Sequence, residues 1–463
     1  MSKSHKLHQH ALATAMAIAL TAGFAGSAAA GARVDTAGLQ SADQTSFDRF
    51  IVKYRDGTSA KALQNNLASA VRGSAQSMTV RHVRSLSVGA EVVKTSRGLD
   101  RVEAESLMRQ IAADPNVVYV EVDRLMQPLM TPNDTHYANY LWGMQSGTGG
   151  IKADQAWDTT SGAGVVVAVL DTGYTDHSDL VGNILQGHDF ISDKRIAGDG
   201  GGRDTDAHDP GDYYRRDNSS WHGTHVAGTV AAVGNNNNGV IGVSYSAKVV
   251  PVRVLGRGGG YTSDIVDGIA WASGGSVAGV PANANPAEVI NMSLGGSGSC
   301  SSTYQNAINA AVARGTTVVV AAGNSNADTT AFSPASCDNV IAVAATNKNG
   351  TRASYSNYGS LIDVAAPGGD SPDCTTLIVS TGNAGTDGPT TENYTCMAGT
   401  SMAAPHVAGT VALIQAARST PLTPAQVESL LKSTLRAFPG NNDQPIGNGI
   451  IDAAAAVSAA PTY

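Results

Sequence analysis

Residues 165–173 read V-V-V-A-V-L-D-T-G and give the clearest indication of the fold class. Six consecutive apolar residues, four of them valine, are typical of a strand buried on both faces of a parallel sheet. Similar runs follow at 248–255, 289–292, 317–322 and 340–345, and segments with helical spacing lie among and after them at 222–232, 263–272, 304–314 and 401–417. This alternation predicts an α/β domain with a doubly wound, mostly parallel sheet.

Three polar motifs lie at the boundaries of these predicted elements, where doubly wound sheets hold their ligands. Asp171 ends the first strand, His222 opens a helix in W-H-G-T-H-V-A-G, and Ser401 opens another in G-T-S-M-A-A-P-H. A serine hydroxyl is a weak nucleophile unless a neutral imidazole accepts its proton and a carboxylate fixes the imidazole tautomer. Each residue alone fits an ordinary turn or helix cap. Together they predict a catalytic triad of Asp171, His222 and Ser401.

The three motifs, in this order, resemble those of the subtilisin-like serine proteases, the subtilases, over about residues 131–457. The resemblance implies that Asp171 orients the imidazole, His222 is general base and acid, and Ser401 is the nucleophile that forms an acyl-enzyme. His225, the second histidine of H-G-T-H, looks like the family's structural histidine; the residues alone do not distinguish it from His222. The implied activity is that of a secreted serine endopeptidase acting on protein or peptide substrates.

The resemblance also assigns the oxyanion hole and the substrate-binding edges. Asn324, in V-V-V-A-A-G-N-S-N, matches the asparagine whose side-chain N–H stabilises the oxyanion, with the backbone N–H of Ser401 as second donor. Read alone, Asn324 is an ordinary turn residue. An extended peptide is expected to add as a strand between two edges. Its expected contacts are Leu255, Gly256 and Gly258 on one edge and Ser293, Leu294, Gly295 and Gly296 on the other.

The N-terminus carries a targeting segment. Lys3 and Lys6 precede the uncharged apolar stretch 11–24, and small residues follow at 28–30. This pattern predicts a signal peptide over residues 1–30 and a secreted, extracellular protein. The alternative, a membrane anchor, is disfavoured because a span needs ~18–20 apolar residues.

Residues 31–130 form a separate segment, with 13 Lys and Arg against 11 Asp and Glu. Strands are predicted at 47–54, 86–93 and 116–122 and helices at 58–71 and 99–112, giving a folded core of about 46–126. The segment resembles the family's propeptide, a small ferredoxin-like α+β domain that assists folding and inhibits the enzyme. We expect residues 125–130 to enter the substrate cleft and to be cut by the enzyme itself, leaving 131–463 as the peptidase domain.

Four cysteines, all in the C-terminal half, permit three disulfide connectivities. Export favours disulfides over free thiols. Loop closure favours near neighbours, and we therefore predict Cys300–Cys337 and Cys374–Cys396.

Two regions are candidates for structural calcium, which prefers oxygen ligands. Asn235 and Asn236, in the run 235–238, resemble a subtilase calcium loop to which Asp179 and Asp134 would contribute carboxylates. Between residues 199 and 212, five carboxylates would repel one another without a cation; a solvated acidic loop is the alternative. These five residues are Asp199, Asp204, Asp206, Asp209 and Asp212.

The formal net charge of −8 argues against a nucleic-acid partner. We expect no membrane span, and we expect the protein to be a monomer. Two other readings remain. An acyl hydrolase or transferase on the same triad would favour G-x-S-x-G, but residues 399–403 read G-T-S-M-A. An inactive binding module would lack a triad member or the oxyanion donor, and none is missing.

Overall fold

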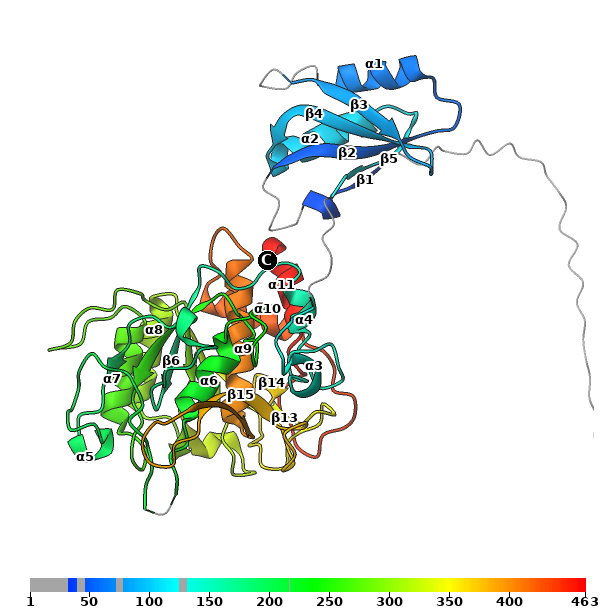
Figure 1. Cartoon of the computed structure of the whole chain (residues 1–463). Helices are drawn as coiled ribbons and strands as arrows, with labels where there is room; N and C mark the ends of the chain where they lie inside the picture. Colours follow the sequence, from blue (N-terminus) through cyan, green and yellow to red (C-terminus); the bar gives the residue numbers. More distant parts are fainter. Residues whose placement is uncertain (1–31, 40–45, 72–77, 125–130, 216) are drawn as a thin grey trace, which may run out of the picture. The chain divides into compact units, whose positions relative to one another are not determined.

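The computed structural model describes residues 32–39, 46–71, 78–124, 131–215 and 217–463 (Figure 1). They form two compact units. The N-terminal unit contains the described residues up to Thr36 and Phe47–Asp123, and the C-terminal unit contains Ala37–Ser46 and Arg124–Tyr463. The predicted signal peptide, 1–30, and the predicted cleavage segment, 125–130, lie outside the described residues. None of the helices in the described part of the chain is long and apolar enough to cross a membrane.

The N-terminal unit is a five-stranded sheet with two helices. Its elements are β1 (Arg33–Asp35), β2 (Phe47–Tyr54), α1 (Ala60–Ala70), β3 (Val80–Ser85), β4 (Ala90–Leu99), α2 (Arg101–Ala112) and β5 (Val117–Val122). The strand order is β1-β5-β2-β4-β3; β1 pairs parallel with β5, and the other neighbours pair antiparallel. From β2 to β5 the order β-α-β-β-α-β is that of a ferredoxin-like fold.

The sequence prediction for this unit is confirmed for β2, β5 and both helices, and for residues 90–93 of the strand predicted at 86–93, which lie in β4. It is wrong for residues 86–89, and it did not include β3. Residues 86–89 form a turn, in which Leu86 N donates to Ala90 O (2.7 Å) and Gly89 N donates to Leu86 O (2.9 Å). Gly89 has a φ of 70°, which glycine adopts without steric cost. β3 gave no apolar signal because most of its side chains are exposed.

The C-terminal unit is built on a seven-stranded sheet in which all neighbouring strands pair in parallel. The order is β14-β13-β11-β9-β6-β8-β7. The strands are β6 (Val166–Asp171), β7 (His188–Asp189), β8 (Lys248–Arg253), β9 (Val289–Met292), β11 (Thr317–Ala321), β13 (Ile341–Thr346) and β14 (Val364–Pro367). All five strands predicted for this sheet are present. The sequence did not predict the two edge strands β7 and β14, which have only two and four residues.

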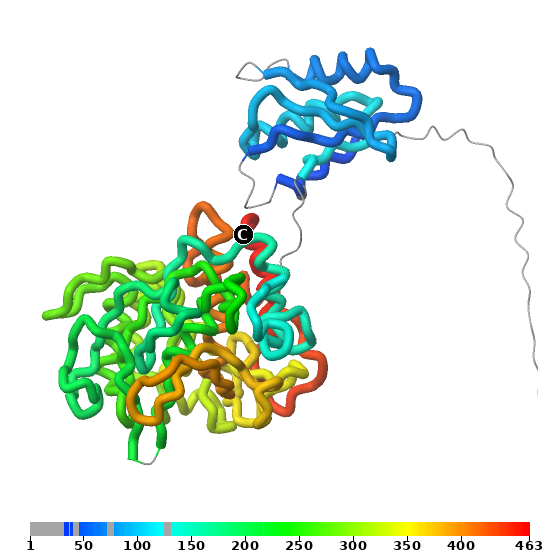
Figure 2. Tube along the Cα trace, in the orientation of Figure 1, coloured from blue at the N-terminus to red at the C-terminus, as the bar shows by residue number. Residues whose placement is uncertain are grey.

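Apolar side chains alternate between the two faces of this sheet and form two cores. Val167 and Val169 of β6 belong to one core, which includes side chains of α6 (His222–Ala231) and α9 (Thr400–Ala416). Ala168 and Leu170 belong to the other, which includes side chains of α7 (Thr262–Ala272) and α8 (Ser302–Ala313). Figure 1 shows these helix pairs on opposite sides of β6, and Figure 2 shows the orange trace of α9 beside the green trace of α6. The predicted doubly wound α/β class is confirmed.

The direction of strand addition reverses around β6. The chain passes from β6 to β8 on one side and then to β9 on the other, so the carboxyl end of β6 lies at the switch point where such sheets bind ligands. Asp171 is the last residue of β6. The sheet topology therefore places the predicted orienting carboxylate where a site is expected.

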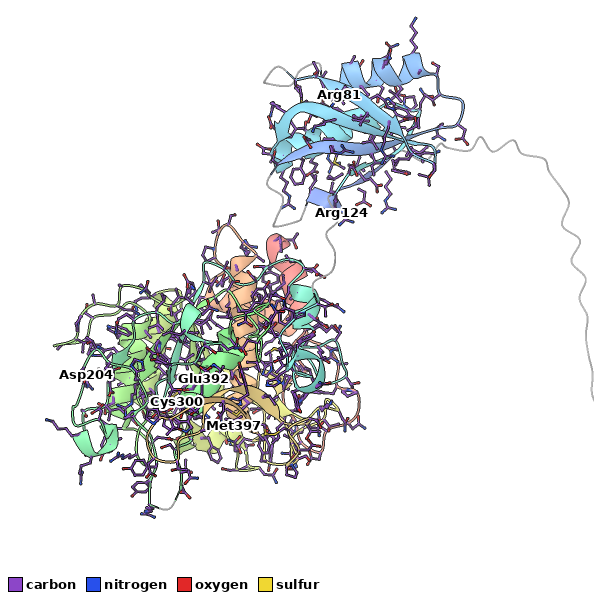
Figure 3. All side chains as sticks on the ribbon, viewed as in Figure 1. Arg81, Arg124, Asp204, Cys300, Glu392 and Met397 are labelled. Carbon is purple, nitrogen blue, oxygen red and sulfur yellow. A yellow bond between two sulfur atoms is a disulfide. The ribbon has the colours of Figure 1, made fainter. Side chains whose placement is uncertain are left out.

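Shorter elements complete the C-terminal unit. A hairpin of β15 (Ile378–Asn383) and β16 (Glu392–Met397) packs against α6; Figure 3 labels the first and last residues of β16. The other helices and strands are η1 (Ala37–Leu39), α3 (Tyr137–Tyr140), α4 (Ala153–Ala156), η2 (Val181–Asn183), α5 (Lys194–Ala197), β10 (Gly296–Ser297), η3 (Thr329–Ala331), β12 (Phe332–Ser333), α10 (Pro424–Ser433), α11 (Ala453–Ala459) and η4 (Ala460–Thr462).

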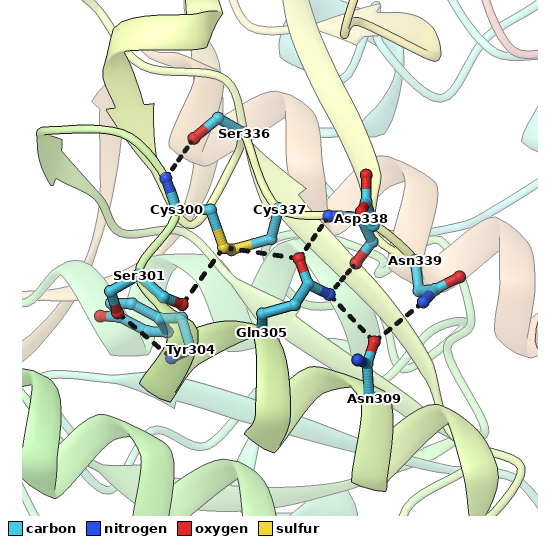
Figure 4. The surroundings of a disulfide bond; sticks show 9 residues. All are labelled: Cys300, Ser301, Tyr304, Gln305, Asn309, Ser336, Cys337, Asp338 and Asn339. Atoms are coloured by element: carbon cyan, nitrogen blue, oxygen red, sulfur yellow. Dashed lines mark hydrogen bonds between the residues drawn. A yellow bond between two sulfur atoms is a disulfide. The ribbon is translucent and has the colours of Figure 1, made fainter.

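Both predicted disulfides are present in the structure. Cys300–Cys337 joins the start of α8 to the segment after β12, with Cα atoms 4.9 Å apart. Around it, Gln305 accepts from Asp338 N (2.8 Å) and donates to Asp338 O (2.9 Å), as Figure 4 shows. Cys374–Cys396 joins the segment before β15 to β16, with Cα atoms 5.4 Å apart.

Candidate active site

Asp171 and His222 form a hydrogen-bonded pair at the end of β6. Asp171 is fully buried, and its Oδ1 lies 2.7 Å from His222 Nδ1 and accepts from Thr172 N at 2.8 Å. Its backbone carbonyl accepts from Val254 N (2.9 Å) and Leu255 N (3.1 Å), which fixes the end of the strand. With Nδ1–H donating to the carboxylate, Nε2 of the neutral ring is the nitrogen left to accept a proton.

The environment of His222 favours its protonated form. Burial lowers the pKa of the imidazole, but the Asp171 carboxylate, with Asp212 and Asp209 further away, outweighs burial and raises that pKa above its ordinary value. The pair is therefore electrostatically suited to stabilise an imidazolium.

Close backbone contacts position the helix that carries His222. Gly223 N donates to Thr172 Oγ1 (3.0 Å), and a Cβ on Gly223 would lie 2.1 Å from Gly173 O. Only glycine therefore fits at position 223. Before the helix, Trp221 adopts a left-handed φ of 52°, and its indole donates to Gly385 O (2.8 Å). The two loops of the Asp–His pair are thus packed directly against each other.

Ser401 and Asn324 are held together by Thr400. Asn324 Oδ1 accepts from Thr400 N (2.8 Å) and from Thr400 Oγ1 (2.9 Å), while Gly323 N donates to that hydroxyl (3.1 Å). Because the amide oxygen of Asn324 is occupied, its N–H groups are the ones left to face a ligand. Ser401 lies in the first turn of α9, where helix N–H groups favour negative charge. The sequence prediction did not include Thr400.

The Ser401 hydroxyl is oriented by Ser293. Ser401 Oγ donates to Ser293 O (3.2 Å), and Ser293 Oγ donates to Ser401 O (2.7 Å). In this structure the hydroxyl of the candidate nucleophile thus donates its hydrogen bond to Ser293. The structure brings together Asp171 with His222, and Ser401 with Asn324; a turn of the Ser401 hydroxyl away from Ser293 is needed before it can donate to His222.

Ser401 and Asn324 line a cleft of about 800 Å³. Of the predicted substrate-binding residues, Leu255, Gly258, Ser293, Leu294, Gly295 and Gly296 line this cleft, and Gly256 does not. Gly256 instead closes a tight turn with Gly259, with backbone hydrogen bonds of 2.9 and 3.0 Å. Small residues, including Ala321, Ala322 and Gly323, form part of the wall and leave room for a substrate side chain.

Two other histidines near the site are structural. His225 is fully buried, lies 3.0 Å through Nε2 from Ile378 O, and has a pKa lowered by burial to about 3. His406 is buried and has a pKa lowered by burial to about 4. Both rings remain neutral. The structure thereby separates His225 from His222, which the residues alone did not.

A buried arginine supports the loop after Asp171. Arg253, the last residue of β8, donates through Nε to Thr172 O (3.2 Å) and pairs with Asp199 (2.9 Å) and with Asp189. Burial raises the pKa of Asp189 to about 7, although the Arg253 guanidinium opposes that shift. The sequence prediction did not include this residue, although a basic side chain directly after the apolar residues 249–252 was its signal.

Asp134, Asp179, Asn235 and Asn236 come together as the sequence predicted. Asp134 Oδ2 accepts from Asn235 N (3.0 Å), and Asp179 Oδ1 accepts from Asn236 Nδ2 (2.6 Å). Both carboxylates are buried, which raises the pKa of each, and Asp134 Oδ1 has no hydrogen-bond partner. Buried oxygens of this kind suit a hard cation.

The five aspartates between residues 199 and 212 are held by separate partners. Asp199 pairs with Arg253 (2.9 Å), Asp206 with His208 (2.6 Å), and Asp212 accepts from Ser220 N (2.6 Å). Asp204 and Asp209 accept backbone N–H groups. No three His, Cys, Asp or Glu side chains in the described ranges are placed to share a metal ion. Asp209 is buried and its Oδ2 has no hydrogen-bond partner. Burial and the nearby Asp212 carboxylate raise the pKa of Asp209 to about 7, so calcium binding in this loop stays a prediction.

Comparison with known proteins gives consistent matches. The model of the Subtilase family matches residues 162–449. The chain is 55% identical to an extracellular protease of Xanthomonas campestris pv. campestris, covering 89% of this chain and 73% of the relative, and 46% identical to an extracellular basic protease of Dichelobacter nodosus, covering 89% and 70%. A solved protease of Pseudoalteromonas arctica PAMC 21717 is 58% identical, with a TM-score of 0.70, and covers 72% of this chain and all of that one.

Proposed function

Because the chain belongs to the subtilase family of serine proteases, we propose that it is an extracellular endopeptidase that cleaves peptide bonds with Ser401, His222 and Asp171. One observation carries this assignment: the buried Asp171–His222 hydrogen bond of 2.7 Å occurs in the same unit as a cleft lined by Ser401 and Asn324. The names of the extracellular relatives agree with secretion.

In the acylation step, Ser401 Oγ attacks the carbonyl carbon of the scissile bond while His222 Nε2 accepts the hydroxyl proton. The carbonyl oxygen becomes an oxyanion, which accepts from Ser401 N–H and Asn324 Nδ2. Donors that are already oriented stabilise this charge without reorganising, and Thr400 supplies that orientation for Asn324. Collapse breaks the C–N bond, and the amine leaves with the proton from His222.

Deacylation uses the same groups in reverse. A water molecule attacks the acyl-enzyme and gives a proton to His222 Nε2. The second tetrahedral intermediate collapses, the carboxylic acid product leaves, and Ser401 Oγ recovers the proton. Asp171 holds the imidazole tautomer throughout.

The N-terminal unit is proposed to be an inhibitory propeptide that the enzyme removes itself. Residues 31–130 hold 13 Lys and Arg against 11 Asp and Glu, a net charge of +2, whereas residues 131–463 hold 15 against 27, a net charge of −12. Opposite charge balances favour association between the two segments.

Calcium is proposed to bind at Asp134, Asp179 and the asparagine loop. The buried, unpartnered Asp134 Oδ1 is the observation that fits a cation there. A bound calcium ion would neutralise two buried carboxylates and tie together three separate segments of the chain.

A fluorophosphonate probe tests the assignment directly, because it reacts only with a serine that a neighbouring base activates. We expect labelling at Ser401, mapped by peptide mass spectrometry, and no labelling of Ser401→Ala. Labelling at another serine, or none in processed wild-type protein, would contradict the mechanism.

A further inference from the structure

A second cavity lies next to the substrate cleft, and Gly258 is the one predicted substrate contact that lines it. It has a volume of about 510 Å³ and shares Gly258, Gly259 and Gly260 with the first. Its other walls are Asp193, Arg195, Ile196, Tyr214, Arg257 and Tyr261. Figure 1 shows α5, which supplies Arg195 and Ile196, at the edge of the C-terminal unit.

The cavity has a defined wall made by the 190–215 segment and the glycine-rich edge. Arg257 N donates to Ile196 O (2.9 Å), and the Arg257 guanidinium lies 4.3 Å from the centre of the Tyr213 ring. Tyr214 and Tyr261 form the rim and are 45% and 53% exposed.

The charge of this cavity is opposite to that of the unit around it. Arg195 is paired with Asp193 (2.9 Å), which also caps α5. No carboxylate in the described ranges pairs with Arg257. Its Nε is buried without a hydrogen-bond partner, and its Nη2 reaches only Gly198 O at 3.5 Å. Arg257 therefore supplies a positive charge in a unit with an excess of carboxylates.

A substrate peptide bound in an extended conformation can reach the second cavity. A peptide that adds as a strand along residues 258–260 points alternate side chains to opposite faces. One set of alternate peptide side chains faces the cleft that contains Leu255 and Leu294. The peptide residue between two members of this set then faces the second cavity. We propose that this second cavity is a specificity subsite for an acidic side chain of the peptide substrate, with Arg257 as its cationic partner.

An acidic side chain would pair with Arg257, whose charge no carboxylate in the described ranges neutralises. The edge of a stacked guanidinium can donate two parallel hydrogen bonds to a carboxylate, and the Tyr214 and Tyr261 hydroxyls can also donate. Because the rim is open to solvent, the gain is that of a partly exposed ion pair. We therefore expect about a threefold to tenfold preference for Glu or Asp over Gln or Asn at one position.

The inference rests on the proposed protease activity, and the first experiment is cleavage-site profiling of the processed wild-type enzyme with a peptide mixture. We expect enrichment of Asp and Glu at one position on one side of the scissile bond. Matched peptides with Glu or Gln at that position then give the ratio of kcat/KM. The ratio should fall at high salt because a solvent-exposed pair is screened.

Variants identify the partner. Arg257→Gln should bring the Glu:Gln ratio close to one, and Arg257→Glu should shift the preference to Lys or Arg. Lys194→Gln is the matched control, since it removes a positive charge from exposed α5 without lining the cavity; it should keep the wild-type ratio. Equal loss in Lys194→Gln would overturn the role of Arg257.

The outcomes separate the two proposals. No cleavage and no fluorophosphonate labelling would contradict the protease assignment. Cleavage with Ser401 labelled but without acidic enrichment at any position would contradict only the subsite. The wild-type profile decides this even if the Arg257 variants fail to fold.

Discussion

At the scale of single residues, Thr400 decides which atoms of Asn324 are available. Its hydroxyl and backbone N–H both donate to the Asn324 side-chain oxygen, at 2.9 and 2.8 Å. Held in this way, the amide can present only its N–H groups to a developing oxyanion. A polar contact behind the site thus sets the chemistry in front of it.

Asn324→Ala should lower kcat far more than it changes KM, because the donor acts on charge that appears only in the transition state. Loss of the corresponding donor in a subtilisin costs about 10²–10³ in kcat, and we expect the same range here. Steady-state kinetics on a peptide substrate measures this effect. Thr400→Val, which keeps the shape but removes the hydroxyl, should cause a smaller loss of kcat; a change in KM alone for Asn324→Ala would contradict the oxyanion role.

The pH dependence of kcat/KM should follow His222, which must be neutral to accept the Ser401 proton. Its pKa is raised, so activity should fall as the pH decreases through a value above that of an ordinary imidazole. Asp212→Asn removes one carboxylate that raises this pKa, and it should move the acid limb to lower pH while leaving the plateau rate largely unchanged.

The control for Asp212→Asn is Asp338→Asn, a neutralisation beside Gln305, which should leave the limb in place. An acid limb that stays at the wild-type pH in Asp212→Asn would show that this carboxylate does not act on His222.

Residue roles were predictable from sequence only where they lie in a contiguous motif. A short sequence motif indicates the chemistry of each of four residues, Asp171, His222, Asn324 and Ser401. Thr400 and Arg253 do not, because their roles come from contacts with residues far away in sequence. For His225 the residues alone left the role open and the family resemblance implied a structural one; its burial and its contact with Ile378 O agree with that expectation.

At the scale of elements, strands buried on both faces were predictable and edge elements were not. The five central strands are continuous apolar runs, and this pattern is visible in the local sequence without knowledge of the neighbouring strands. β7 and β14 are strands only because β8 and β13 pair with them, and β3 is mostly exposed. Local sequence cannot carry a signal that the partner strand supplies.

The Cys300–Cys337 link should stabilise the start of α8 and the end of β12. Replacing both cysteines by serine removes a closed loop of 37 residues, which loop-closure entropy values at up to about 3–4 kcal/mol in the free energy of unfolding. Thermal unfolding of Cys300→Ser/Cys337→Ser should therefore show a lower Tm than wild type. An unchanged Tm would mean that the hydrogen bonds of Gln305 are sufficient to hold this corner.

At the scale of the whole molecule, calcium should stabilise the folded C-terminal unit. A ligand that binds only the folded state adds about 2.7 kcal/mol at a hundredfold excess over its Kd. Excess chelator should lower the Tm of wild type, and calcium should restore it. Asp134→Asn should respond less to both additions; equal Tm values with and without chelator in wild type would contradict the proposed site.

Removal of the N-terminal unit should depend on the nucleophile of the same chain. Ser401→Ala changes little volume and leaves the cleft intact, so the folded precursor should retain residues 31–130, whereas wild type expressed in parallel should lose them. Intact mass spectrometry distinguishes the two. Adding active wild-type enzyme is the control for an accessible site, and loss of the segment from pure Ser401→Ala without any protease would contradict self-processing.

The fold also determines when the proposed catalytic residues are first brought together. Asp171, His222, Asn324 and Ser401 come from four separate segments of the chain, and Ser401 lies in α9, which packs beside strands formed earlier in the chain. A ribosome-bound chain that ends before α9 lacks the proposed nucleophile, Ser401. Because synthesis proceeds from the N-terminus, the proposed catalytic residues are all present only after most of the chain has been made, and they form a site only after it has folded.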